Sequence, residues 1–368
     1  MRSIFPFLFS LFSVGFLFSQ EEEKNHFSIE ANYFYGNIFE HNKDIGHLIV
    51  GHPEGVMLSY NNKTYGLTEA ERRYGYPDWG FTFVYQDMKN PILGDNYSAY
   101  GHYTWYFVKR RLALTVGTGV AYNTNPYDID TNFKNNAYGT AILSTSLFKL
   151  GYTYENLWKG FGVNAGLFFL HYSNGNLKAP NTSTNTFGIN AGITYQFNAD
   201  EFPDYIPLEE DEPNISEPIK YNIVFRSGIN QSDVIGHNRE PFYVLSGYAD
   251  KRLNFKSSLQ GGIDIFFSKF IKEFVLYRSI AFPDDGLDGD EDYKRVGVFI
   301  GHELRFNRTA FEAQLGYYVY WPSKFENRVY NRLGLKRYFY DSRIFGTVAV
   351  KGHWAKAEAI EFGVGLRL

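Results

Sequence analysis

Two side chains able to do acyl-transfer chemistry stand two residues apart in the stretch FFLHYSNGNLKAPNTSTNTFG, residues 168–188. They are His171 and Ser173. In nucleophilic acyl transfer a serine attacks an ester carbonyl, a histidine takes the serine proton, and a third group orients the imidazole. Amides of the Asn- and Gly-rich turn that follows, residues 174–181, are suited to donate hydrogen bonds to the oxyanion. The pair therefore indicates a candidate esterase site.

Strand periodicity predicts where this pair points. The odd-numbered residues from Phe161 to Phe169 are apolar, and His171 and Ser173 continue that face. In the next segment the odd-numbered residues of 187–197 are again mostly apolar, and Asn185 has the same parity. Because side chains alternate between the two faces of a strand, we expect His171, Ser173 and Asn185 to lie together on an apolar outer face. The alternative is that the pair sits in an interfacial belt and binds only water and headgroups.

The same alternation recurs along the chain, for example in residues 26–38 and 111–122. Roughly eight such segments precede Phe197 and roughly eight more follow Ile219, which is the pattern of a transmembrane β-barrel. Strands that cross a membrane must close into a barrel, because an open edge leaves backbone groups unpaired. We predict an all-β, outer-membrane antiparallel barrel of about 16 strands in two tandem halves of about 8. One large barrel is favoured over two small ones, since two closed barrels in one chain would be unusual.

The sequence divides into four predicted regions. The first residues combine one arginine, a short apolar run and a small residue before charge, which is typical of a signal peptide cut near Ser19. The halves echo each other weakly, with IGH at 45–47 and 235–237 and GH at 101–102 and 301–302, so the second is interpreted as a degenerate repeat. The predicted regions are a signal peptide (1–19), a first barrel half (20–198), an acidic, Pro-rich linker (199–218) and a second barrel half (219–368).

Composition excludes several classes of protein. The 368 residues include 30 Tyr and 35 Phe, yet mean hydropathy is −0.33 and no later segment approaches the ~18 apolar residues of a membrane helix. The net charge of −4 argues against a nucleic-acid partner, which needs a basic surface. The absence of cysteine leaves neither a lipoprotein anchor nor a disulfide framework. A soluble periplasmic β protein is the alternative class.

The motif HYSNGNLKAPN, from His171 to Asn181, resembles the signature of lipid A 3-O-deacylases of the PagL type, also called acyloxyacyl hydrolases. The resemblance implies an outer-membrane barrel with a serine esterase site on its lipid-facing surface. That site would remove the ester-linked 3-hydroxyacyl chain at the 3-position of lipid A, with neither metal nor other cofactor. It implies that Ser173 is the nucleophile and His171 the general base, with Asn181 in the oxyanion region and Asn174 as a weaker helper.

The sequence departs from that family pattern at two positions. The acidic triad member falls at Asn185, whose neutral amide can orient a histidine but cannot stabilise an imidazolium as a carboxylate does. A family glycine is replaced by Ser183, which changes the expected loop. In the second half, His353 occupies the matching strand end, but Ala355 stands where a serine would be needed. We therefore expect no second active site.

These observations predict a carboxylic ester hydrolase of the cell outer membrane that acts on lipid A of lipopolysaccharide in the outer leaflet. The alternative is a non-catalytic barrel, either a porin or a lipopolysaccharide-binding surface protein. The oligomeric state is not predicted.

Two further clusters have metal-ligand chemistry. His41, His47 and His52 are loosely spaced, and we expect them to pack within a loop or face solvent. The run DDGLDGDED, residues 284–292, offers oxygen ligands but lacks a complete calcium-loop pattern. We expect an exposed acidic loop there.

Overall fold

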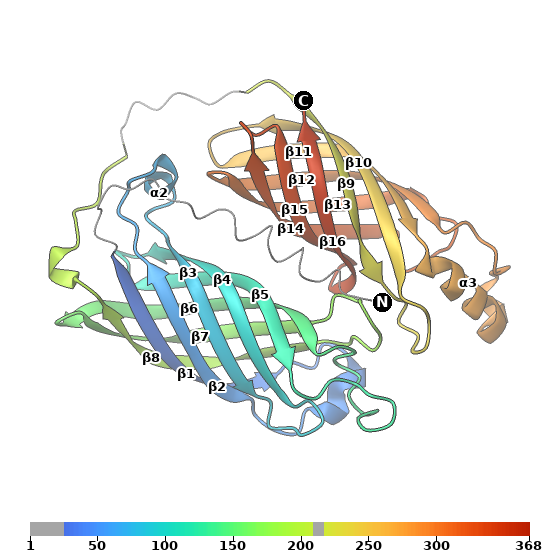
Figure 1. The fold of residues 1–368 in the computed structure, drawn as a ribbon, viewed down its shortest axis with the longest axis horizontal. Coiled ribbons are helices and arrows are strands. Elements are labelled where there is room, and N and C mark those ends of the chain that lie inside the picture. The colour runs from blue at the N-terminus through green and yellow to red at the C-terminus, as the bar shows by residue number, and fades with distance from the viewer. Residues whose placement is uncertain (1–25, 209–216) are drawn as a thin grey trace, which may run out of the picture.

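The computed structural model describes residues 26–208 and 217–368, and the expected signal peptide, 1–19, lies outside them. Figure 1 shows two β-barrels side by side, joined by the segment that follows β8. Within the described residues, no helix is long and apolar enough to cross a membrane.

The first barrel is an antiparallel meander in which each strand pairs with the next and β8 returns to β1. We use "entry end" for the end of a barrel where its first strand begins, and "far end" for the opposite one. The short helices η2 (Lys43–Leu48) and α2 (Glu69–Arg73) lie in its loops. The strands are β1 (Phe27–Ile38), β2 (Glu54–Asn62), β3 (Asp78–Asp87), β4 (Asp95–Phe107), β5 (Leu112–Asn123), β6 (Ile142–Trp158), β7 (Phe161–Ser173) and β8 (Thr184–Gln196).

The second barrel repeats this topology, and β16 closes it on β9. The helix α3 (Phe270–Ala281) and the short η4 (Pro283–Asp285) extend from its far end between β11 and β12. Its strands are β9 (Lys220–Asn230), β10 (Glu240–Arg252), β11 (Ser257–Ser268), β12 (Lys294–Phe306), β13 (Thr309–Tyr320), β14 (Val329–Phe339), β15 (Ile344–His353) and β16 (Lys356–Arg367).

The prediction of two tandem halves with eight strands each is confirmed, and the preference for one large barrel is wrong. The backbone pairing gives the reason. β8 pairs along its whole length with β1, from Gln196 opposite Ser28 to Thr186 opposite Ile38. No edge of β8 is left to pair with β9, so each half closes separately.

The two sequence echoes fall at equivalent places in the two barrels. Residues 45–47 and 235–237 follow β1 and β9, and residues 101–102 and 301–302 lie in β4 and β12. The interpretation of the second half as a degenerate repeat stays a prediction.

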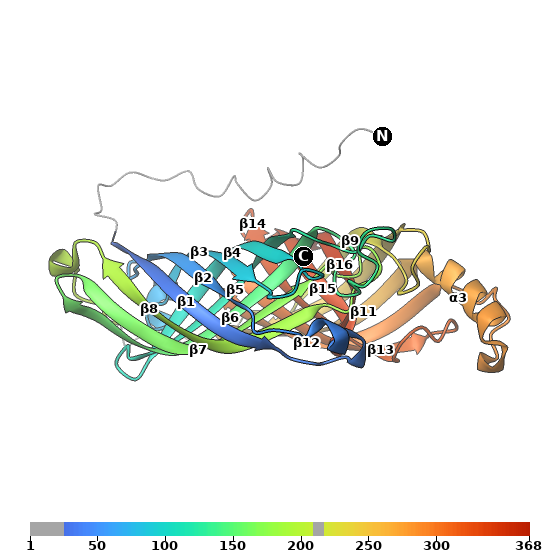
Figure 2. The same ribbon diagram turned by 90° about the horizontal axis from the view of Figure 1, so that it is seen from below.

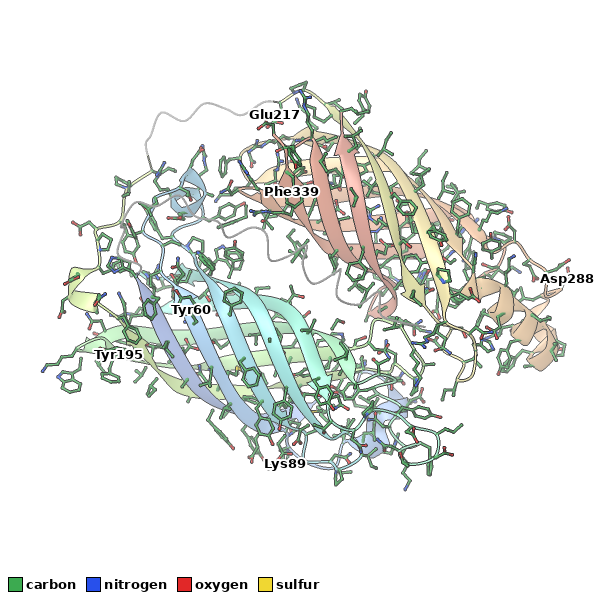
Figure 3. The ribbon with its side chains drawn as sticks, viewed as in Figure 1. Tyr60, Lys89, Tyr195, Glu217, Asp288 and Phe339 are labelled. Atoms are coloured by element: carbon green, nitrogen blue, oxygen red, sulfur yellow. The ribbon has the colours of Figure 1, made fainter. Side chains whose placement is uncertain are left out.

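Outward and inward side chains differ sharply in character. In β1 the outward residues Ile29, Tyr33 and Tyr35 are exposed, whereas Asn32 and Phe34 are buried. The exposed, outward-pointing residues of the other strands are also largely apolar or aromatic. Figure 3 shows Tyr60 and Tyr195 on the first barrel and Phe339 on the second, with Lys89 and Asp288 nearer the far ends. Tyr195 belongs to a group of rings at the entry end of the first barrel, with Trp158, Phe161, Phe197, Phe27 and Tyr60.

Side chains fill both interiors. The far half of the first barrel holds an apolar cluster that includes Phe34 and Phe168, and its entry half holds polar groups around a cavity of about 30 Å³. The second barrel holds buried ion pairs next to a cluster of apolar and aromatic side chains. Arg332, fully buried, donates to Glu361 at 2.6 Å and to Asp264 at 2.9 Å.

Like ends of the two barrels touch (Figures 1 and 2). At the entry end, Tyr74 packs on Phe306 with ring centroids 4.7 Å apart and donates a hydrogen bond to the carbonyl of Arg305. Burial raises the pKa of Tyr74 to about 12, so the phenol stays a donor at neutral pH. At the far end, the loop after β7 reaches Gln231, just beyond β9. The described part of the predicted linker folds back on the first barrel, where Tyr76 donates to the carbonyl of Ile206 at 2.7 Å.

Candidate active site

The register of β7 and β8 places His171 directly opposite Asn185. The ring Nδ1 lies 2.7 Å from Asn185 Oδ1. With an amide oxygen facing the ring, Nδ1 carries the proton and Nε2 presents its lone pair. The amide therefore holds the imidazole in the tautomer that a general base requires.

Ser173 ends β7 on the same side of the strand as His171, and its side chain is buried. Its Oγ donates to Asn181 Oδ1 at 3.2 Å and accepts from the backbone N–H of Gly175 at 3.0 Å. Within residues 26–208 no hydrogen bond joins Ser173 to His171. The hydroxyl must rotate away from Asn181 before Nε2 can take its proton, which is common for catalytic pairs without substrate.

Asn181 is held so that its amide nitrogen is available. Its Oδ1 accepts from the backbone N–H of Asn174 at 2.9 Å and from Ser173. Because the N–H of Asn174 can donate only to the amide oxygen, Nδ2 of Asn181 points away from Asn174. The described residues give Nδ2 no hydrogen-bond partner. Nδ2 is the candidate oxyanion donor. Asn174 lies in the same cluster, but its own amide donates to the carbonyl of Lys178 at 2.6 Å, so its side chain supports the turn.

Ser183 keeps the backbone that glycine would favour. Its φ of +61° is in the left-handed region, which costs a serine more than a glycine. Its Oγ lies 3.2 Å from Nε2 of His41. Ser183 therefore adopts a backbone conformation that is also open to glycine, and the expected change of the loop stays a prediction.

We call the loop between β7 and β8, residues 174–183, the catalytic loop after the role proposed for it. It is enclosed on two sides. From the first barrel, the carbonyl of Asn136 accepts from the N–H of Thr182 at 3.1 Å. From the second barrel, Gln231 binds Asn176 and Ala179. Sequence reasoning missed Gln231, because it belongs to the other half of the chain and no motif marks it.

The other candidate residues lie apart from this cluster or do other work. His47 Nε2 bonds to the carbonyl of Lys134 at 2.9 Å, and His52 Nδ1 to Asn37 Oδ1 at 2.6 Å. In residues 284–292, Glu291 accepts from the N–H groups of Asp288 and Gly289. No cluster of three or more metal-ligating side chains occurs in the described ranges. His353 is buried inside the second barrel, with Nε2 2.9 Å from Glu358.

Two family models match most of the chain. The family model of the lipid A 3-O-deacylase (PagL) matches residues 54–194. The model of the acyloxyacyl hydrolase C-terminal domain matches residues 219–368.

The chain belongs to the PagL lipid A 3-O-deacylase family. The PagL match covers the end of β7, the catalytic loop and most of β8, so all the candidate residues of the serine esterase site lie inside it.

No curated protein matches the chain. Among solved structures, a triple mutant and a double mutant of the Rhodopseudomonas blastica porin are similar at 10% and 9% identity. Each comparison covers 93% of this chain and 99% of the porin at a TM-score of 0.19. At that score the likeness carries no weight for fold or function, and the assignment to the PagL family depends on the family models.

Proposed function

We propose that this protein is an outer-membrane serine esterase that hydrolyses the ester-linked 3-hydroxyacyl chain at the 3-position of lipid A. One observation carries the proposal. Asn185 bonds to His171, and Asn181 bonds to Ser173, within the segment that the PagL model matches. A hydrolase acting on lipid A is the activity that membership of this family supports.

Each residue has one task in the reaction. Ser173 Oγ attacks the acyl carbonyl while His171 Nε2 takes its proton, and Asn181 Nδ2 donates to the oxyanion that forms. The protonated His171 then gives its proton to the leaving sugar oxygen. Water attacks the acyl-enzyme with the same histidine as base, which releases the 3-hydroxy acid and restores Ser173. Asn185 keeps the imidazole oriented throughout.

The outward alternation supports a site that faces lipid. His171 and Ser173 continue the face on which Phe161, Val163 and Leu167 are exposed. We place the entry ends at the periplasm and the far ends, with the catalytic loop, at the outer leaflet. Apolar walls and a group of aromatic rings at one end are typical of transmembrane barrels. Lipid A is then the substrate within reach.

The filled interiors favour an enzyme over the porin alternative. Barrels of eight strands have room for side chains, whereas aqueous channels need about 16 strands or more. In the second barrel Arg226, Arg295 and Arg332 are each 0% exposed. A lipopolysaccharide-binding protein without catalysis remains the competing function.

Mass spectrometry of lipid A tests the proposal. Outer membranes that contain the native protein should yield lipid A lighter by one 3-hydroxyacyl group, and membranes without it should not. Unchanged lipid A in membranes where the protein migrates as a folded barrel would contradict the proposal.

Asn181→Ala should lower kcat by about 10²- to 10³-fold, the usual cost of one oxyanion donor. Asn181→Asp is the matched variant, because its carboxylate still accepts from Asn174 but has no N–H to donate. Steady-state kinetics on lipid A in detergent micelles should show both variants impaired. Full activity of Asn181→Asp would exclude Nδ2 as the donor.

Asn185→Glu should keep or raise activity, by up to about 10-fold, because a carboxylate stabilises the imidazolium that forms in the reaction. Asn185→Gln has the same length without the charge and serves as control. A loss of activity in Asn185→Glu, with the barrel intact, would show that Asn185 does not occupy the triad position.

A further inference from the structure

We infer that the second barrel positions the catalytic loop through Gln231, and that full activity requires this contact. The inference rests on the proposed function for its kinetic consequences. It assigns a task to residues 219–368, which contain none of the proposed catalytic residues.

Gln231 engages the loop with both its backbone and its side chain. Its N–H donates to the carbonyl of Asn176 at 3.0 Å, and its own carbonyl accepts from Asn176 Nδ2 at 2.9 Å. Its Oε1 accepts from the N–H of Ala179 at 2.9 Å. Gln231 and Asn176 are 4% and 2% exposed, so these bonds form away from bulk water, where an unpaired group is costly.

The contacts with Gln231 lie between those of the proposed site in sequence. Asn181 accepts from Ser173 and from the N–H of Asn174. Asn176 and Ala179, which lie between Asn174 and Asn181, bond to Gln231. Moving Ala179 therefore moves Asn181, two residues away. An oxyanion donor is effective only when it is held in place before the reaction.

The loop also fits against the wall of the second barrel without spare room. Gly175 has φ +62°, and a Cβ on it would lie 2.4 Å from Ile360 Cγ1 in β16. β9 and β16 are paired between the entry end and the pair Ser227–Phe362, and their parts nearer the far end are not paired with each other. The loop lies against these strands beyond the point where their pairing stops, and the N–H of Gln231 bonds to the loop there.

Gln231 is itself fixed within the second barrel. Its Nε2 donates to the carbonyl of His237, and His237 Nδ1 lies 2.6 Å from Ser232 Oγ. With Nε2 engaged in this way, Oε1 faces Ala179. Ser258 is also buried in the second barrel, but it lies near the start of β11 at the entry end, and the described residues give its Oγ no hydrogen-bond partner. It provides the control, because its hydroxyl bonds to neither Gln231 nor His237.

The test compares Gln231→Ala with Ser258→Ala in the full-length protein. Hydrogen exchange followed by mass spectrometry reports on amides 174–181, and kinetics on lipid A in micelles report kcat and KM. In Gln231→Ala we expect faster exchange in this loop and a fall in kcat of about 10- to 100-fold, the scale of a small misplacement of catalytic groups. KM should stay within about twofold. Ser258→Ala should match the native protein in both, and Gln231→Glu, which keeps an acceptor for Ala179, should recover part of kcat.

Native exchange and native kcat in a folded Gln231→Ala would overturn the inference and leave the esterase proposal intact. An inactive native protein would instead overturn the esterase proposal, and the exchange measurement would still decide whether Gln231 holds the loop. Should Gln231→Ala fail to fold, as judged by mobility on a cold detergent gel, Asn176→Gly takes its place. It removes the amide that binds Gln231 and keeps the left-handed φ of +63°. Native exchange in that variant would equally contradict the inference.

Discussion

Ser173→Ala is expected to lower kcat on lipid A by about 10⁴-fold or more, because the variant has no oxygen to form the acyl-enzyme. Deletion of a nucleophile leaves only the residual effect of binding and oxyanion stabilisation. Lipid A from membranes that contain this variant should have the same mass as lipid A from membranes without the protein.

Ser257→Ala is the matched control for this result. Ser257 begins β11 on its outward face, and its Oγ lies 2.5 Å from His302 Nε2. The control therefore removes an outward-facing serine at the entry end, opposite the end that holds the site. Both variants should resist unfolding in cold detergent as the native protein does. Deacylation by a folded Ser173→Ala would exclude Ser173 as the nucleophile.

His171→Gln is expected to lower kcat by a similar ~10⁴-fold, because glutamine can hydrogen-bond but cannot carry a proton between Ser173 and the leaving group. The double variant Ser173→Ala/His171→Gln should be no worse than either single one, since residues that act as one unit are not additive. Single-turnover assays on lipid A micelles would measure all three.

His102→Gln provides the control for the histidine. His102 lies inside the first barrel, where its ring bonds to Thr82 and Asn61, each at 2.9 Å. Its replacement tests whether loss of a barrel histidine alone reduces activity. Equal losses in His102→Gln and His171→Gln would mean that the effect comes from the fold, and the role of His171 would have to be abandoned.

Periodicity predicted the strands and the faces because one strand side meets an apolar surrounding and the other does not. This contrast predicted that Phe161, Leu167 and His171 share one face of β7, and Phe161 and Leu167 are exposed on it. The number of barrels did not follow. It depends on whether β8 pairs with β1 or with β9, and those strands have the same alternation.

The candidate site could be predicted only in part. His171 and Asn185 have the same parity, but their direct pairing depends on the register that the turn between β7 and β8 sets. The direction of the Asn181 amide nitrogen depends on which backbone N–H donates to its Oδ1. Gln231 could not be found at all, because its contacts with Asn176 and Ala179 connect two barrels that share no strand pairing.

With the proposed function, an outward-facing Ser173 would also change what substrate concentration means for this protein. Lipid A that reaches an outer wall arrives by lateral diffusion, and both products, a fatty acid and an underacylated lipid, would stay in the same leaflet. Turnover should then follow the mole fraction of lipid A among its neighbours, and diluting it with an inert lipid should slow the reaction at constant bulk concentration. The released fatty acids would accumulate around the barrel and would gradually alter the lipid in which it is embedded.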